Sequence, residues 1–561
     1  MAVINIGDGV TVISTANIES TSGAASAAVT IQIATGGTLN IDGGLVRSIN
    51  HAGRAIVNNG ELNISDGTVS AVAGVAIVST GTGTVTISGG KVSATSVAGA
   101  AIVSEGTGLI TISGDAEVTS INTTTTQGTI HLSSGAGATE RLRIEGGKVE
   151  NMVDNQSAKA IRNNTNGGIT ITGGEVTTSA NGNAIRNDGS GDITISGGTV
   201  SATTGAAIRN ESTGEVNISG GTVLSSLSSG RAIVSNGLGP IYISQAAGNE
   251  TKITSLNTAA STIHLTGGGN LSISGGEVTN SASGNAIYNQ NNSNGSITIS
   301  GGTVQAGTGR AILSDSLGAI SISQDTDTTL ITSENRLSAQ GTIHLSGGGG
   351  LLIEGGEVKN TSNIADSKAI HNTTAGTVTI TGGTVESTRP ADAYAVYSAV
   401  ETAALSIDFD NADIIGQVHP DSEFTVASTA GWEAVLTSIS TGGDNREYTI
   451  EVTGDISIEG SSGNTDLTFG NATDIEVTIT GSGTLTVDSD ATRVLLVGAN
   501  QTLIVGETGS PGPTLQFINN SAAGNNTVVH VRDGGIFELR GETITGGNCS
   551  TGTFLGGGVY V

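Results

Sequence analysis

The stretch Gly83-Thr-Val-Thr-Ile-Ser-Gly-Gly-Lys-Val-Ser-Ala94 decides the fold of this chain. Val85 and Ile87 alternate with polar residues before the Gly-Gly pair, and Val92 follows after it. Alternation with a period of two is typical of a β-strand with one buried face. The Gly-Gly pair supplies the positive backbone torsion that a sharp corner between strands requires. The stretch therefore predicts two short strands joined by a tight corner.

The same pattern returns along most of the first 390 residues. Copies of apolar-x-Ile-x-Gly-Gly-x-Val begin at Leu39, Val85, Leu142, Ile169, Ile193, Val216, Leu271, Ile297, Leu351 and Val378. With looser variants between them, successive copies are 23 to 32 residues apart. A near-regular period in this range indicates a solenoid. Because each repeat reads as short strands and turns, we expect an all-β, right-handed parallel β-helix with about 23–32 residues per rung.

A third short strand, Ala-Ile-x-Asn or Ala-Ile-x-Ser, closes many of the rungs. Its asparagines are Asn58, Asn163, Asn187, Asn210, Asn289 and Asn372. Amide side chains that recur at one position of a coil can hydrogen-bond to their neighbours on adjacent rungs. Buried amides need such partners. We predict that these asparagines form an internal structural ladder.

The residue before each of these asparagines should point outward. Arg162, Arg186 and Arg209 hold this position on consecutive rungs, at a spacing of about 4.8 Å. Stacked guanidinium groups repel one another unless carboxylates or a bound anion lie between them. The sequence favours pairing with Asp188 and Glu211, and it leaves open a site for an acidic glycan or another anion.

The same outward position also carries apolar and aromatic side chains, among them Tyr288 and His371. A line of basic, aromatic and apolar groups along one face could act as a contact strip. Tyr288 and His371 therefore join the three arginines as candidate binding residues.

Composition excludes several classes of partner. The formal net charge is −28, so the chain repels phosphate backbones and we expect no nucleic-acid partner. Cys549 is the single cysteine, which rules out an internal disulfide framework. No apolar run is long enough to span a bilayer, so we expect no membrane insertion. The first residues lack the basic and apolar regions of a signal peptide.

The regular repeat loosens near Pro390. Residues 428–440 show helical spacing, with Trp432 and Ile439 on one apolar face. Strand alternation resumes near residue 441. We predict a long parallel β-helix over residues 1–390, a junction over 391–440 with a capping helix near 428–440, and a second β-helix segment over 441–561. The closing Gly-Gly-Gly-Val-Tyr-Val561 reads as a strand just begun, so we expect the second segment to be truncated.

Signals for metal binding are weak. Asp408, Asp410 and Asp413 could bind Ca²⁺ through their oxygens. They match no complete calcium-loop motif, so we predict no cofactor and no metal, with Ca²⁺ at these aspartates as the alternative. His131, His264 and His344 lie in three Thr-Ile-His-Leu segments, whole rungs apart, and cannot share one metal ion.

Signals for catalysis are weak as well. Acidic pairs occur without a basic or histidine partner nearby in the sequence, and no nucleophile elbow or phosphate loop is present. We do not expect an enzyme.

The rungs resemble the adhesin-like right-handed parallel β-helix repeat proteins of bacterial cell surfaces. The resemblance rests on the Ile-Ser-Gly-Gly-x-Val rungs of residues 37–390, on Trp432, on Gly442-Gly-Asp-Asn-Arg-Glu-Tyr-Thr-Ile450 and on Gly481-Ser-Gly-Thr-Leu-Thr-Val487. It implies an extracellular or cell-surface setting, and its motifs specify rungs rather than binding residues.

We therefore expect a non-enzymatic, structural and adhesive rod that displays a face for a surface glycan or protein. Two other classes stay open. A phage or injection-system fibre would use the same rod as a trimer and would need no signal peptide. A β-helix polysaccharide lyase or glycosidase would need clustered carboxylates and bases on one face. The sequence carries no signal for the oligomeric state.

Overall fold

The computed structural model describes residues 2–20, 28–49, 52–135, 139–179, 181–290, 294–325, 327–389, 393–400, 405–419, 423–442, 446–458, 468–471, 473–487, 493–506, 513–517, 527–540, 544–545 and 559–560. The chain is a parallel β-solenoid of about 17 turns, with 56% of it in strands and a single short helix in the described part. The predicted all-β solenoid is thereby confirmed. Cys549 lies outside the described residues, as do residues 546–558 and 561, where most of the expected truncated strand falls.

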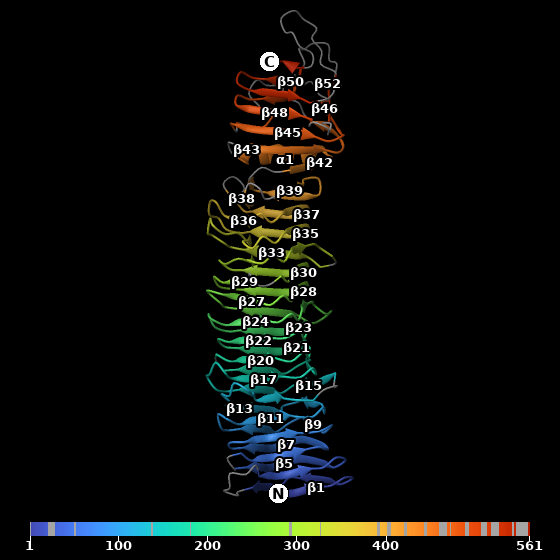
Figure 1. Cartoon of the computed structure of the whole chain (residues 1–561), viewed down its shortest axis with the longest axis vertical. Coiled ribbons are helices and arrows are strands. Elements are labelled where there is room, and N and C mark those ends of the chain that lie inside the picture. The colour runs from blue at the N-terminus through green and yellow to red at the C-terminus, as the bar shows by residue number, and fades with distance from the viewer. Residues whose placement is uncertain are drawn as a thin grey trace, which may run out of the picture. The chain divides into compact units, whose positions relative to one another are not determined.

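The chain forms two compact units. Unit 1 comprises Met1–Gly318 and Asp325–Thr329, and unit 2 comprises Ala319–Gln324 and Leu330–Val561. Within each unit, strands that are a rung apart in the sequence lie one above another (Figure 1). The division at residues 390 and 440 that the repeat pattern indicates stays a prediction.

The Ala-Ile-x-Asn strands form the first sheet of unit 1. Its strands are β1 (Ala2–Ile6), β4 (Val29–Ile33), β6 (Arg54–Asn58), β8 (Val75–Ser79), β11 (Ala100–Ser104), β14 (Ile130–Leu132), β17 (Lys159–Asn163), β20 (Asn183–Asn187), β22 (Ala206–Asn210), β24 (Arg231–Ser235), β27 (Ser261–Leu265), β29 (Asn285–Asn289) and β31 (Ile312–Ser314). Neighbouring strands pair in parallel, so that Ile161 lies opposite Ile185 and Ile185 opposite Ile208. Equivalent residues of successive rungs therefore stand in one line.

The Gly-Gly segments form the other faces of unit 1. In several rungs one long strand runs through the corner: β5 (Thr38–Ser48), β7 (Glu61–Ala71), β21 (Ile193–Ala202), β23 (Val216–Ser225), β28 (Leu271–Asn280) and β30 (Ile297–Ala306). In the others two strands flank the corner: β9 (Thr84–Ile87) and β10 (Lys91–Ala94), β12 (Ile110–Ile112) and β13 (Glu117–Ser120), β15 (Glu140–Ile144) and β16 (Lys148–Asn151), β18 (Gly168–Ile171) and β19 (Glu175–Thr178). The pairs β2 (Thr11–Ser14) and β3 (Asn17–Ser20), and β25 (Ile241–Ile243) and β26 (Thr251–Ser255), complete the set.

Glycine is required at the second position of these corners. Gly198 has a φ of 73°, which L side chains rarely adopt. A Cβ atom at Gly198 would also lie 2.7 Å from the carbonyl oxygen of Gly174 on the preceding rung. The corners of successive rungs therefore pack backbone against backbone.

The core of each rung is a narrow stack of branched apolar side chains. Ile171, Ile195 and Ile218 lie opposite one another on successive rungs, and each is at most 1% exposed. Full burial of such a side chain contributes about 1.5–3 kcal/mol. The stack needs no large aromatic filler, which matches the 2% aromatic content.

Unit 2 repeats this arrangement. Its first sheet contains β34 (Ile343–Leu345), β36 (Lys368–Asn372), β38 (Tyr394–Ser398) and β41 (Gln417–His419). Its other strands before the helix are β32 (Ile320–Ile322), β33 (Thr329–Ser333, from Leu330 onward), β35 (Leu351–Asn360), β37 (Val378–Ser387), β39 (Leu405–Asp408), β40 (Ala412–Ile415) and β42 (Glu423–Val426). After the helix come β43 (Arg446–Val452), β44 (Asp455–Ile458), β45 (Ile475–Thr480), β46 (Thr484–Val487), β47 (Arg493–Val497), β48 (Gln501–Val505), β49 (Thr514–Phe517), β50 (Thr527–Val531), β51 (Ile536–Leu539), β52 (Ile544–Thr545) and β53 (Val559–Tyr560).

The predicted helix is present as α1 (Thr429–Gly442). Ser428 accepts a hydrogen bond from the backbone N–H of Gly431 at 3.1 Å and so caps the first turn. Trp432, Val435 and Ile439 are buried on one face. That face packs against β41, β42 and β44 within unit 2. The helical period in the sequence is therefore explained by burial of one stripe.

Candidate functional site

One line of side chains runs along the first sheet of unit 1, and we call it the outer row. Each strand of this sheet from β4 to β31 contributes its second-to-last residue to this row. The residues are Gln32, Val57, Val78, Val103, His131, Arg162, Arg186, Arg209, Val234, His264, Tyr288 and Leu313. The outer row of unit 2 contains His344, His371, Tyr397 and His419. In each unit the register brings these residues side by side.

Two of the three Thr-Ile-His-Leu segments belong to the first sheet of unit 1, and the third, with His344, belongs to the first sheet of unit 2. His131 lies opposite Arg162, and His264 lies opposite Tyr288. These strands take the place of Ala-Ile-x-Asn, with leucine in place of the asparagine. The place of these histidines in the outer row was not predicted from the sequence, although the isoleucine that they share with Ala-Ile-x-Asn was a signal for it.

Behind the outer row lie the predicted asparagines, which are all 0% exposed: Asn58, Asn163, Asn187, Asn210, Asn289 and Asn372. Asn163 donates to the side-chain oxygen of Asn187 at 3.0 Å, and Asn187 donates to that of Asn210 at 3.1 Å. Each of these three also donates to a backbone carbonyl within its own rung, at 2.7 to 3.0 Å. The other three donate to the carbonyl oxygens of Thr84, Gly295 and Gly376. The amides thus satisfy buried backbone groups and connect neighbouring rungs.

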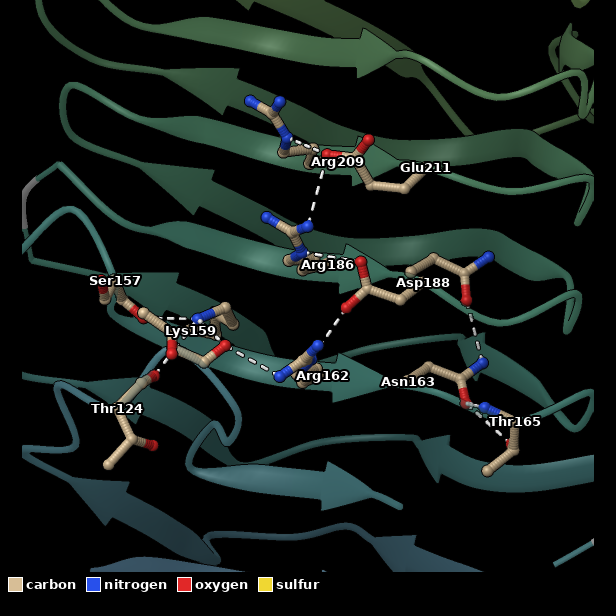
Figure 2. Close-up of polar contacts among 12 residues, drawn as sticks. Thr124, Ser157, Lys159, Arg162, Asn163, Thr165, Arg186, Asp188, Arg209 and Glu211 are labelled. Carbon is tan, nitrogen blue, oxygen red and sulfur yellow. Dashed lines mark hydrogen bonds and ion pairs between the residues drawn. The ribbon is translucent and has the colours of Figure 1, made fainter. Parts of the chain in front are cut away.

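The three arginines of the outer row alternate with two carboxylates (Figure 2). The two oxygens of Asp188 accept hydrogen bonds from Nε of Arg162 and Nε of Arg186, each at 2.8 Å. Glu211 accepts a hydrogen bond from Arg209 and lies 3.6 Å from Nη2 of Arg186. Each carboxylate therefore bridges two guanidinium groups, and the stacked positive charges are separated by negative ones.

The carboxylate of Glu211 is held in its charged form. Burial by itself would raise the pKa of Glu211, but hydrogen bonds from Arg209 and Asn236 and the charges of Arg209 and Arg186 bring it below its ordinary value. Asn236 donates at 3.0 Å. A carboxylate held this way serves as a fixed counter-charge rather than as a proton donor.

Lys159 extends the cationic cluster at the start of β17. Its ammonium group donates to the carbonyl oxygens of Ser157 at 2.7 Å, Thr125 at 3.3 Å and Thr124 at 3.4 Å (Figure 2). Burial, followed by the charges of Arg162 and Arg186, lowers the pKa of Lys159 to about 8. Arg162 also donates to the carbonyl oxygen of Thr125 at 2.8 Å.

A depression of about 430 Å³ opens beside this cluster. Arg186, Arg209 and Arg231 line it, together with Gln156, Asn181, Asn183, Thr204, Gly205, Ala206, Ser229 and Val234. None of these lining residues, all within the described part of the chain, is acidic. Neither Arg231 nor Lys159 was among the residues predicted from the sequence, because both precede Ala-Ile and the prediction covered the residue that follows it.

Tyr288 and His264 form a second contact of the outer row in unit 1. Their rings are stacked, with centroids 4.9 Å apart and planes inclined by 10°. The hydroxyl of Tyr288 donates to Asp315 at 2.7 Å, and burial together with this contact raises the pKa of Tyr288 to about 12. Burial and the charge of Arg231 lower the pKa of His264 to about 4. The ring pair is therefore neutral at pH 7.

The outer row of unit 2 is aromatic. The ring centroids of His371 and Tyr397 lie 5.3 Å apart, edge to face, and those of Tyr397 and His419 lie 4.3 Å apart, stacked. His344 contacts His371 at 4.8 Å. His371 is 5% exposed, because rings on both sides cover it.

Lys368 and Tyr394 stand beside this aromatic row. The ammonium group of Lys368 lies 4.6 Å from the ring centroid of Tyr397 and 5.2 Å from that of Tyr394. It also donates to the carbonyl oxygens of Ser338 at 2.6 Å and Asp366 at 2.9 Å. These groups, with His371, Thr373, Ala339 and Ala399, line a depression of about 570 Å³.

Of the three aspartates considered for Ca²⁺, Asp408 and Asp410 bond to neighbouring groups of the chain, and Asp413 is exposed. Asp408 accepts hydrogen bonds from the backbone N–H of Asp410 at 3.0 Å and from Asn411 at 2.8 Å. Asp410 accepts hydrogen bonds from the backbone N–H of Ala427 and the hydroxyl of Ser428, just before α1. In the described ranges, no three side chains of His, Cys, Asp or Glu gather as a metal site.

No family model, no curated protein and no solved structure matches this chain. Among the described helices, none has the length and apolar character that crossing a membrane would need.

Proposed function

We propose that this chain is a non-enzymatic, structural and adhesive β-solenoid that binds glycans along its outer rows, at a cell surface or outside the cell. One observation carries the proposal: in each unit the outer row flanks a depression lined by basic or aromatic side chains, in a protein whose net charge is −28. Basic and aromatic groups on a rigid sheet are suited to a polar, ring-shaped ligand.

The chemistry of the two depressions fits sugars. Guanidinium groups donate paired hydrogen bonds to oxyanions and hydroxyls. Aromatic rings offer flat apolar faces to the C–H groups of a pyranose ring. Both volumes fall within the roughly 300–1,000 Å³ that is usual for small-molecule sites.

The two carboxylates of the charged row are held by arginines, and this favours glycan binding over glycan cleavage. Asp188 and Glu211 are each shared between two arginines. Glycoside hydrolysis needs one carboxyl group that stays protonated near neutral pH, whereas the pKa of Glu211 is lowered, its arginine and Asn236 contacts outweighing burial. The arrangement supplies fixed charges for recognition.

The test is binding of the purified full-length chain to a broad glycan array, with soluble products analysed from the same wells. Saturable binding without released oligosaccharides is the expected result. Failure to bind any glycan would overturn the adhesive proposal, and released products would overturn its non-enzymatic part.

A further inference from the structure

The cationic cluster of unit 1 contains more positive groups than its carboxylates neutralise. The side chains of Lys159, Arg162, Arg186, Arg209 and Arg231 stand on four successive strands, β17, β20, β22 and β24. Asp188 and Glu211 are the carboxylates that form ion pairs with them in the described structure. The cluster therefore has a local excess of positive charge within an acidic chain.

Arg231 is the clearest part of this excess. It forms no ion pair with any described residue, and its Nε is buried without a hydrogen-bond partner in the described structure. Arg231 is half-buried, and withdrawing a guanidinium partly from water without a counter-charge carries an energetic cost. A ligand that brings a negative charge to this guanidinium would remove that cost.

The depression gives such a ligand room and a direction. Figure 2 shows the terminal nitrogens of Arg209 pointing away from Glu211, and both Arg209 and Arg231 line the depression. Amides and hydroxyls surround them, from Asn181, Asn183 and Thr204. These groups can donate to and accept from the hydroxyls of a sugar.

We infer that the depression bounded by Arg186, Arg209 and Arg231 binds the carboxylate of an acidic sugar residue, a hexuronate within a glycan. The inference rests on the proposed glycan-binding function and names its ligand class. A planar carboxylate matches the two parallel N–H donors of a guanidinium. Arg231 supplies the unpaired positive charge, and the polar rim holds the sugar ring.

The experiment measures binding of the full-length chain to an α-1,4-linked galacturonate trisaccharide by titration calorimetry. The fully methyl-esterified trisaccharide serves as the neutral comparison, because it keeps the sugar rings and removes the charges. We expect the ester to bind roughly tenfold or more weakly, as befits a lost charge-assisted contact. Equal affinity for the acid and the ester would overturn the inference while leaving glycan binding intact.

Two variants locate the site. Arg231→Gln should weaken binding of the acidic trisaccharide by roughly tenfold or more. Arg54→Gln is the matched control, because Arg54 begins β6 as Arg231 begins β24 and does not line the depression. We expect the control to change affinity by less than about twofold. Unchanged affinity in Arg231→Gln would overturn the site, and thermal unfolding of both variants checks that they fold.

Inorganic sulfate as a competitor separates a sugar site from a general anion site. Sulfate should displace the trisaccharide only at concentrations far above those at which the trisaccharide binds. Displacement by sulfate at equal concentration would show that the depression recognises any oxyanion, against the inference. If neither the acid nor the ester binds and the glycan array is also blank, the proposed function itself fails.

Discussion

The outer rows of the two units occupy the same position of the strand, but their neighbouring side chains are held together by different interactions. In unit 1, Arg162, Arg186 and Arg209 are separated by carboxylates at hydrogen-bond distance. In unit 2, His371, Tyr397 and His419 contact one another through their rings. The rung spacing of about 4.8 Å brings any two neighbours into contact. Charged rows therefore need counter-charges from adjacent residues, whereas aromatic rows pack directly.

This difference has consequences for solvent conditions. Ion pairs between partly exposed groups, such as those of the charged row, weaken with salt, while ring contacts do not. The feature that the two units share is the buried asparagines behind both outer rows.

The largest expected effect comes from that shared element. Asn187→Ala would remove three hydrogen bonds of 2.8 to 3.1 Å: the acceptor for one N–H of Asn163, the donor to the side-chain oxygen of Asn210 and the donor to the carbonyl of Gly191. Unsatisfied buried groups cost about 1–3 kcal/mol each, so we expect a loss of about 3–5 kcal/mol. Urea unfolding measures it, and Asn372→Ala tests whether unit 2 depends on its ladder equally. A loss below about 1 kcal/mol would show that the ladder is not a main source of stability.

The second effect is the pH dependence that His131 contributes. Burial, followed by the charge of Arg162, lowers the pKa of His131 to about 4, against the opposing effect of Asp188. A lowered histidine pKa means that the folded state resists protonation. The contribution of neutral His131 to the free energy of unfolding is therefore complete above pH 6.5 and is lost as the pH falls toward 4.

His131→Gln removes this titration. The stability of the wild type should fall by roughly 2–3 kcal/mol more than that of the variant between pH 7 and pH 4. Urea unfolding at a series of pH values checks this. If the free energy of unfolding depended on pH in the same way for the two proteins, His131 would be protonated as easily in the folded chain as in the unfolded one.

A third prediction addresses the charged row directly. Asp188→Asn leaves Arg162 and Arg186 without their shared carboxylate, and we expect a loss of about 1–2 kcal/mol, most of it recovered at high salt. Glu105→Gln is the matched control, because Glu105 is exposed and in no ion pair among the described residues. Thermal unfolding at low and high salt makes the comparison. A loss that is the same at both salt concentrations would contradict the role of charge separation.

The fourth prediction concerns the aromatic row, where the expected loss is similar to that for Asp188→Asn. Tyr397→Ala removes the stack on His419 and the ring beneath Lys368, for an expected loss of about 1–2 kcal/mol. Tyr397→Phe keeps the ring and should lose less than about 0.5 kcal/mol. Neither loss should depend on salt. Strong salt dependence in thermal unfolding of Tyr397→Ala would show that the two rows are not held by different forces.

Much of the fold was accessible to prediction from the sequence. The parallel solenoid and the helix at residues 429–442 followed from local periodicities and capping residues. The pairing of Arg186 with Asp188 was also suggested, since the two residues are neighbours on one rung. The position of His131 was missed because its segment, Thr-Ile-His-Leu, departs from the Ala-Ile-x-Asn motif. The position of Arg231 was missed because this residue lies before the first residue of the motif.

The sequence by itself determined the rung, because alternating apolar residues and Gly-Gly corners act within a dozen residues. It also determined which residues recur at each position of the rung. Only the tertiary structure decided which groups of different rungs touch: that Asp188 lies between Arg162 and Arg186, and that Arg231 borders a depression. The physical reason is that these contacts depend on the register between strands 23 to 26 residues apart, and on the loops between them, which a local pattern does not specify.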